Sequence, residues 1–132
     1  MQLRICSVIS LLLVLSLMGC GRGGHEKFIP SIESAREALQ ETLLAWKSGQ
    51  PYKEIDIFDP KIQPVESRWQ QGKQLLDFEI VEELEKTGTK QFRVKLTFAD
   101  AKAPEETTYI VLGKDPLYVY WITDYEQSSK TM

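Results

Sequence analysis

The apolar residues of this chain change their spacing along the sequence, and each spacing predicts a different kind of element. After Pro30 they recur every three or four positions, and charged or polar residues fill most of the positions between them. The apolar positions of this segment are Ile32, Ala35, Leu39, Leu43 and Trp46. This spacing predicts an amphipathic helix whose apolar stripe faces the core, with Ser31 as its N-cap and Gly49 and Pro51 beyond its end.

From Gln74 onward apolar residues occupy every second position, which predicts β-strands. A two-residue turn at Thr87-Gly88 would set the apolar face of the first strand against the polar face of the second, because a shift of one residue turns every side chain over. We therefore expect a three-residue loop over residues 86–88. The expected pairs are Ile80 with Val94, Phe78 with Leu96, Leu76 with Phe98 and, on the polar face, Glu79 with Lys95. Glu82 is the only carboxylate expected on the apolar face.

Shorter elements are expected on either side of this hairpin. Residues 51–58 are predicted to form a second short helix, and residues 66–72 a turn or single helical loop. Pro64 confines any strand around it to a sheet edge, because proline has no backbone N–H to donate. Two further strands are expected at residues 107–112 and 117–122.

The order of these elements predicts an α+β fold. We expect a long N-terminal helix packed on a curved antiparallel sheet of three to four strands, in a single domain over residues 31–125. Residues 126–132 are polar and are expected to form a disordered tail.

The last predicted strand is apolar on both faces. One face must meet the core, so the other is either covered by the short helices and Trp69 or exposed for binding. The exposed face would hold either Tyr118, Tyr120 and Ile122 or Leu117, Val119 and Trp121. The aromatic residues Tyr118, Tyr120 and Trp121 are therefore the candidate binding surface.

The first nineteen residues have the parts of a secretory signal peptide. Arg4 is their only charge, residues 5–18 are predominantly apolar, and Gly19 is small. A helix over the apolar run would be about 21 Å long, against a hydrocarbon core of about 30 Å. The run is therefore too short for a permanent membrane span.

The tetrapeptide Leu17-Met18-Gly19-Cys20 resembles the lipobox of bacterial lipoproteins, whose three defining places are filled here by Leu17, Gly19 and Cys20. The resemblance implies cleavage before Cys20, which then carries a diacylglyceryl thioether and an N-acyl chain such as palmitate, while residues 20–30 form a flexible tether. Gly21, in place of the family's inner-membrane retention aspartate, implies the outer membrane if the cell has one. The alternative is an ordinary signal peptide cut elsewhere, which leaves Cys20 as a free thiol.

Composition excludes several classes of function. Removing nineteen of the 132 residues leaves 113, and removing Arg4 leaves 15 basic against 19 acidic side chains. This balance argues against a nucleic-acid partner. Cys6 leaves with the signal, Cys20 carries lipid, and the single histidine, His25, lies in the tether. We therefore expect no disulfide, metal site, cofactor or catalytic residue in the domain.

The order of elements over about residues 31–124 resembles the NTF2-like and cystatin-like folds, whose enzymes work inside a cone between sheet and helix. The expected function is nevertheless a non-catalytic binding or structural module of the cell envelope, anchored to the membrane through Cys20, with an envelope protein as its partner. It includes a helper that only holds another protein near the membrane. The alternative is a small-ligand carrier or enzyme with an apolar cone pocket, which would use Asp56, Asp77 or Glu82 with a tyrosine.

Overall fold

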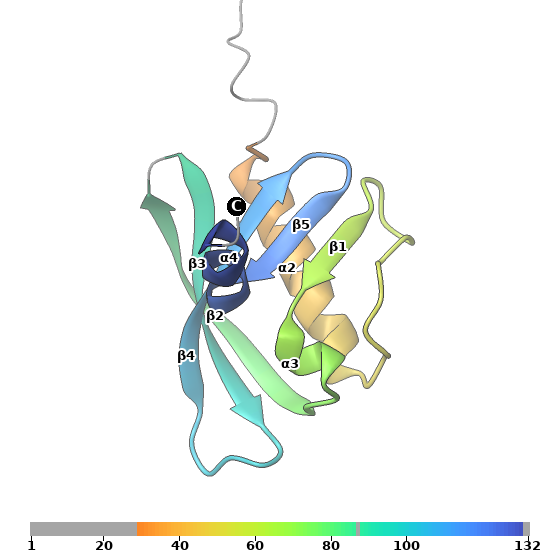
Figure 1. The fold of residues 1–132 in the computed structure, drawn as a ribbon, viewed down its shortest axis with the longest axis vertical. Helices are drawn as coiled ribbons and strands as arrows, with labels where there is room; N and C mark the ends of the chain where they lie inside the picture. The colour runs from red at the N-terminus through yellow and green to blue at the C-terminus, as the bar shows by residue number, and fades with distance from the viewer. Residues whose placement is uncertain (1–28, 87, 131–132) are drawn as a thin grey trace, which may run out of the picture.

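The computed structural model of this protein describes residues 29–86 and 88–130 (Figure 1). The expected signal peptide, the lipidation site Cys20 and most of the expected tether lie outside the described residues. Within the described ranges the chain forms an α+β fold with three helices and one five-stranded mixed sheet.

Helix α2 (Ile32–Lys47) forms where the apolar spacing predicted a helix. The Ser31 hydroxyl caps its start by accepting a hydrogen bond from the backbone N–H of Ser34 at 3.2 Å. Beyond its end Gly49 has a φ of +84°, a left-handed conformation that glycine adopts without strain. The helix has 16 residues, so the expectation of a long N-terminal helix is wrong, because the glycine stops it after an ordinary length.

The sheet has the strand order β1-β5-β4-β3-β2. Its strands are β1 (Ile62–Val65), β2 (Leu75–Lys86), β3 (Thr89–Phe98), β4 (Glu105–Gly113) and β5 (Leu117–Trp121). β1 lies parallel to β5, whereas the other neighbouring pairs are antiparallel. The expectation of an antiparallel sheet of three to four strands is therefore wrong, but β1 does lie at an edge, as Pro64 predicted.

The turn between β2 and β3 differs from the three-residue loop predicted for residues 86–88. Lys86 pairs directly with Thr89, which leaves two residues between the strands. A two-residue turn by itself would pair the apolar face of β2 with the polar face of β3. A β-bulge removes this mismatch, because Val81 is an extra residue between two paired positions of β2.

On the other side of this bulge, β2 has the predicted register. The confirmed pairs are Phe78 with Leu96, Glu79 with Lys95 and Ile80 with Val94. A second bulge at Leu76 places Leu75 opposite Phe98, so the predicted pair of Leu76 and Phe98 is wrong. The bulge at Val81 also places Glu83, instead of the predicted Glu82, on the apolar face, since Glu83 pairs with the buried Phe92.

Two short helices complete the fold. Helix α3 (Ser67–Gln70) is the helical turn predicted for residues 66–72. Residues 51–58 contain no helix, contrary to the prediction, because Ile55 and Ile62 exchange two backbone hydrogen bonds of 2.8 and 2.9 Å. The backbone of this segment therefore pairs with the start of β1.

Helix α4 (Ile122–Lys130) follows β5 directly, so the disordered tail expected from residue 126 is wrong for residues 126–130. Two contacts place the helix. The Asp124 carboxylate accepts a hydrogen bond from the backbone N–H of Ser67 at 2.7 Å, and the Tyr125 ring meets the Tyr120 ring edge-on.

Helix α2 covers one face of the twisted sheet, here called the helix face, and α4 lies against the opposite, outer face (Figure 1). Side chains of α2, β3, β4 and β5 fill the space on the helix face. Those with no exposed surface are Ala35, Leu39, Leu43, Phe92, Val94, Leu96, Val111 and Val119. The core therefore lies between α2 and the sheet.

Candidate functional site

The three residues predicted as one binding surface do not share a face of the sheet. Tyr118 and Tyr120 point to the outer face, because the residue between them, Val119, is fully buried on the helix face. Trp121 pairs with the buried Tyr109 and lies on the helix face. The prediction that Trp121 belongs to the surface is therefore wrong, since successive side chains of a strand alternate between faces.

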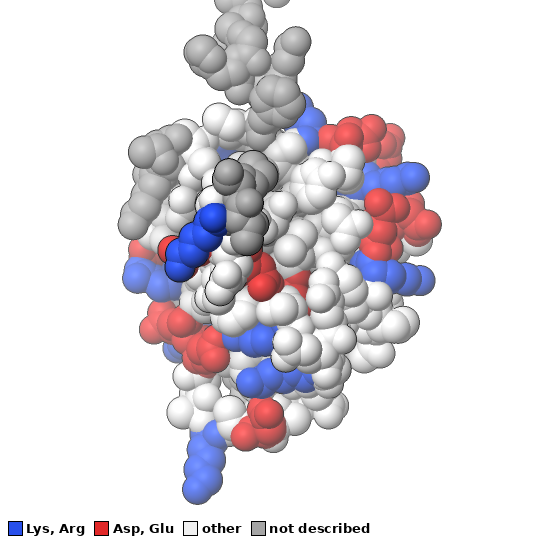
Figure 2. All heavy atoms as spheres, in the orientation of Figure 1, with Lys and Arg blue, Asp and Glu red and all other residues white. Residues whose placement is uncertain are grey.

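The outer face carries three tyrosine rings in contact, here called the tyrosine row: Tyr118, Tyr120 and Tyr125. Tyr118 stacks on Tyr120 with ring centroids 6.2 Å apart, and Tyr120 meets Tyr125 edge-on at 5.6 Å. The register neighbours of Tyr118 and Tyr120 on the flanking strands are uncharged; they are Gln63, Val65, Ile110 and Leu112. Figure 2 shows a largely uncharged area over β5 and β1, with charged side chains around it.

Burial raises the pKa of Tyr120 above its ordinary value, and the neighbouring hydroxyls of Tyr118 and Tyr125 raise this pKa further. Tyr120 therefore stays neutral at physiological pH. It offers a flat apolar ring together with a hydroxyl that donates and accepts hydrogen bonds, a combination enriched at protein interfaces.

A buried charge cluster of Glu66, Arg68 and Tyr109 lies on the helix face beside Trp121. Glu66 is 1% exposed and Arg68 9%. The Glu66 carboxylate accepts hydrogen bonds from the Arg68 guanidinium at 3.0 and 3.1 Å and from the Tyr109 hydroxyl. The Trp121 ring covers the guanidinium at 3.6 Å, and Arg68 also donates to Glu105 at the surface. The charges of the cluster are therefore paired and screened from water.

Local structure brings two members of this cluster together. Glu66 is the N-cap of α3, and its carboxylate also accepts a hydrogen bond from the backbone N–H of Arg68 at 2.9 Å. Tyr109 comes from β4, 43 positions further along the chain. Sequence reasoning missed all three residues. One signal was available in the sequence. Tyr109 lies in a predicted strand, and if its side chain faces the core, its buried hydroxyl requires a hydrogen-bond partner.

The cluster is suited to holding charge in place rather than to moving protons. Burial alone would lower the pKa of Arg68, but the hydrogen bond to Glu66 and the adjacent negative charge raise this pKa above its ordinary value. Burial, followed by the charge of Glu66, raises the pKa of Tyr109 well above its ordinary value. The four pockets at the surface of the described residues are lined by other side chains.

Alkaline pH should destabilise the protein through Tyr109. The pKa of Tyr109 is raised in the folded state, so the unfolded chain releases this proton first, and stability present below pH ~10 is lost as the pH rises above ~10. Tyr109→Phe should lower the free energy of unfolding at neutral pH by about 1–3 kcal/mol and make its decline above pH ~10 shallower. Urea unfolding over a pH series measures both effects, and an equally steep decline in the variant would contradict the assignment.

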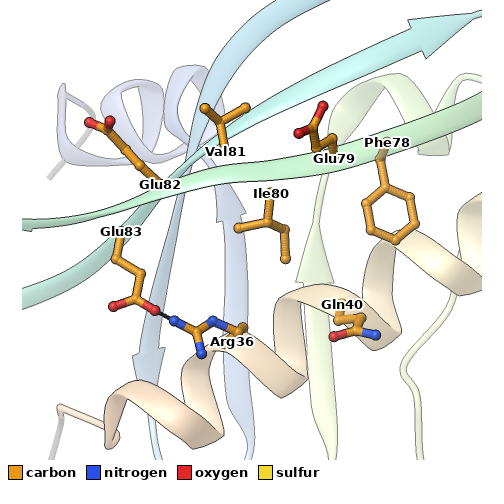
Figure 3. A pocket seen from close by; sticks show the side chains of 8 residues that line it. All are labelled: Arg36, Gln40, Phe78, Glu79, Ile80, Val81, Glu82 and Glu83. Carbon is orange, nitrogen blue, oxygen red and sulfur yellow. Dashed lines mark ion pairs between the residues drawn. The ribbon is translucent and has the colours of Figure 1, made fainter.

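An open groove lies between α2 and the edge of the sheet at β2, with a volume of about 710 Å³. It is lined by Arg36 and Gln40 of α2 and by residues 78–83 of β2, and we call it the α2–β2 groove. Figure 3 shows Phe78, Ile80 and Glu83 pointing toward α2, while the residues between them point away. Ion pairs join the two elements at both ends, Arg36 with Glu83 and Lys47 with Asp77.

The three carboxylates offered as alternatives for a cone-fold carrier or enzyme lie in three different places. Asp77 is exposed; the hydrogen bond from Lys47 and then the backbone N–H of Phe78 lower its pKa. Glu82 lies on the outer face and pairs with Arg93 at 2.5 Å. Asp56 is exposed in the segment before β1. The carrier or enzyme alternative names one of these three carboxylates with a tyrosine, and none of the three is buried.

Residues 29–86 and 88–130 contain no group of three or more histidine, cysteine, aspartate or glutamate side chains that could hold a metal ion. No helix in these ranges is long and apolar enough to cross a membrane.

Comparison of the chain with known proteins found no matching family model, no matching curated protein and no matching solved structure. A functional proposal must therefore come from the residues themselves.

Proposed function

We propose that this protein is a bacterial lipoprotein, anchored in the cell envelope by acylated Cys20, whose domain is a non-catalytic binding module. Its contact surface is the tyrosine row. The observation that carries this proposal is a run of three touching tyrosine rings, two of which, Tyr118 and Tyr120, have uncharged neighbours on the flanking strands, in a chain of which 27% is charged. Aromatic residues without nearby charges are typical of the centres of protein interfaces.

The partner is a protein on the same membrane surface. The ten residues from Gly21 to Pro30 reach at most ~35 Å when fully extended, so the anchored domain stays close to the bilayer. The lipobox resemblance, with Gly21 after the cysteine, favours the outer membrane of a cell that has one.

We also propose that the sheet and α2 form an NTF2-like or cystatin-like arrangement with a filled cone. The side chains that would line the cone pack against one another, and Leu39, Val94 and Val111 have no exposed surface. The buried charged residues on the same face, Glu66 and Arg68, form hydrogen bonds with each other. The largest open volume between α2 and the sheet is the α2–β2 groove at the sheet edge, and four of its eight lining residues are charged: Arg36, Glu79, Glu82 and Glu83. This arrangement supports a binding module over a small-ligand carrier or an enzyme, because a cone pocket needs an apolar lining.

Metabolic labelling tests the anchor. We expect the full chain to incorporate labelled palmitate and to sediment with membranes, and Cys20→Ser to lose both properties completely, because no acyl chain can then be attached. Cys6→Ser is the matched control and should change neither. A wild-type chain that is released without label would overturn the lipoprotein proposal.

Crosslinking in intact cells tests the contact surface. A photoreactive phenylalanine derivative replaces Tyr118, and the same derivative replaces Ile57, which is 86% exposed, as the matched control. We expect one discrete crosslinked protein from position 118 and none from position 57. Adding Tyr120→Ser should reduce the product at least tenfold, because truncating a hot-spot residue costs about 2 kcal/mol or more and about 1.4 kcal/mol corresponds to tenfold in affinity. Equal yields from the two positions would overturn the tyrosine row as contact surface.

A further inference from the structure

The α2–β2 groove has an unusual wall, because six consecutive residues of one strand line it. These are residues 78–83 of β2, the last strand of the sheet order. At ~3.3 Å per residue, this stretch of strand offers about 20 Å of edge, with the bulge at Val81 in its second half. Edge strands present backbone N–H and C=O groups that no second strand satisfies, and such a row is a template for an incoming strand.

The space between β2 and α2 can hold side chains of an incoming segment. Phe78 and Ile80 point toward α2 and are only partly buried (Figure 3). Gln40 is exposed, and Leu44, one turn further along the same side of α2, is 38% exposed. The ion pairs Arg36–Glu83 and Lys47–Asp77 bound this stretch at both ends. An extended segment in the groove would therefore contact both apolar side chains and polar or charged side chains.

The negative charge of β2 indicates which kind of segment would bind in the groove. The strand contains five carboxylates and one lysine; the carboxylates are Asp77, Glu79, Glu82, Glu83 and Glu85. Pairing of β2 with β2 of a second copy would bring like charges face to face, which is destabilising. A segment with lysine or arginine would instead complement Glu79 and Glu82, whose side chains point away from α2 (Figure 3). Glu82 already pairs with Arg93 of β3, and Glu79 lies opposite Lys95 of the same strand, so the segment would add a second basic partner to each.

We propose that the α2–β2 groove binds an extended, basic segment of a partner protein, which adds as a sixth strand along β2. Its apolar residues contact Phe78, Ile80 and Leu44, and its basic residues contact Glu79 and Glu82 on the other face. The surface is separate from the tyrosine row, so either proposal can fail while the other holds.

The test uses the full chain in a non-ionic detergent and a synthetic heptapeptide of alternating lysine and valine. We expect binding by titration calorimetry at low salt, with amide chemical-shift changes concentrated in β2 and α2. The same peptide with N-methylated valines keeps its charge but loses donors of the ladder, and should bind at least tenfold more weakly. An alternating glutamate and valine peptide should not bind.

Variants of the protein separate strand addition from general electrostatic attraction. Glu79→Gln with Glu82→Gln should weaken binding about tenfold, because two charged contacts of the site are lost. Glu54→Gln with Glu126→Gln makes the same charge change on exposed residues elsewhere and should leave affinity unchanged, as should Tyr118→Ser. Circular dichroism checks that each variant is folded, and the N-methylated peptide tests the proposal on the unaltered protein.

Five results would overturn the proposal. The first four are no binding of the lysine–valine peptide, equal binding of its N-methylated form, equal weakening by both pairs of glutamine substitutions, and a dimer in sedimentation experiments that Glu79→Gln with Glu82→Gln strengthens. The dimer would assign the edge of β2 to a second copy. Tighter binding of a peptide with the sequence of residues 21–28 would assign the groove to the protein's own tether and would also overturn it.

Discussion

The Glu66→Gln variant is expected to lose about 3–5 kcal/mol of unfolding free energy, because breaking a buried ion pair leaves one charge without its partner. Glu66 is 1% exposed and accepts hydrogen bonds from Arg68 and from the Tyr109 hydroxyl. Glutamine preserves the shape of the side chain but removes its charge. The Arg68 cation would then remain beneath Trp121 with only the half-exposed Glu105 to balance it. Urea unfolding monitored by circular dichroism measures the loss.

Two control variants test the cause of this effect. Glu66→Met with Arg68→Met removes both charges and should be more stable than Glu66→Gln alone, because no charge remains buried. Lys47→Met breaks an exposed ion pair with Asp77 and should cost less than about 1 kcal/mol. If Glu66→Gln cost no more than Lys47→Met, the cluster would not be a dry, coupled unit.

Replacement of Trp46 with alanine is expected to cost about 3–5 kcal/mol, because it opens a large cavity at the end of the core. The Trp46 ring stacks on Trp69 with centroids 6.1 Å apart and lies 5.6 Å from Phe98. Its indole N–H donates a hydrogen bond to the Lys73 carbonyl at 2.7 Å. One side chain therefore joins α2 to the segment between α3 and β2 and to β3.

Comparison with smaller changes shows which part of Trp46 matters. Trp46→Phe keeps an aromatic ring but loses the N–H donor, and should cost about 1–3 kcal/mol. Leu44→Ala lies on the same helix at a residue that is 38% exposed, and should cost less than Trp46→Ala. Urea unfolding gives all three values. A cost for Trp46→Ala as small as that for Leu44→Ala would contradict the central role of this ring.

The candidate surfaces were only partly predictable. The apolar doublets Leu75-Leu76 and Ile80-Val81 interrupt the alternation of β2, and each contains one bulge residue. These doublets were a usable signal, since an extra residue in one strand produces two neighbours of the same kind. The α2–β2 groove depends on where the strand ends up in the sheet, and no local pattern states that β2 is an edge.

Neighbouring residues were sufficient to predict α2, the four strands from Leu75 to Trp121, and the edge position of β1 at Pro64, because periodicity and proline chemistry act within a few residues. Contacts between distant residues decided the rest. Three features depend on contacts between segments more than 40 positions apart. They are the parallel pairing of β1 with β5, the contact of Trp121 with Arg68 on the helix face, and the burial of Glu66 beside Tyr109. Only the folded chain brings such partners together, so their chemistry cannot be read from spacing alone.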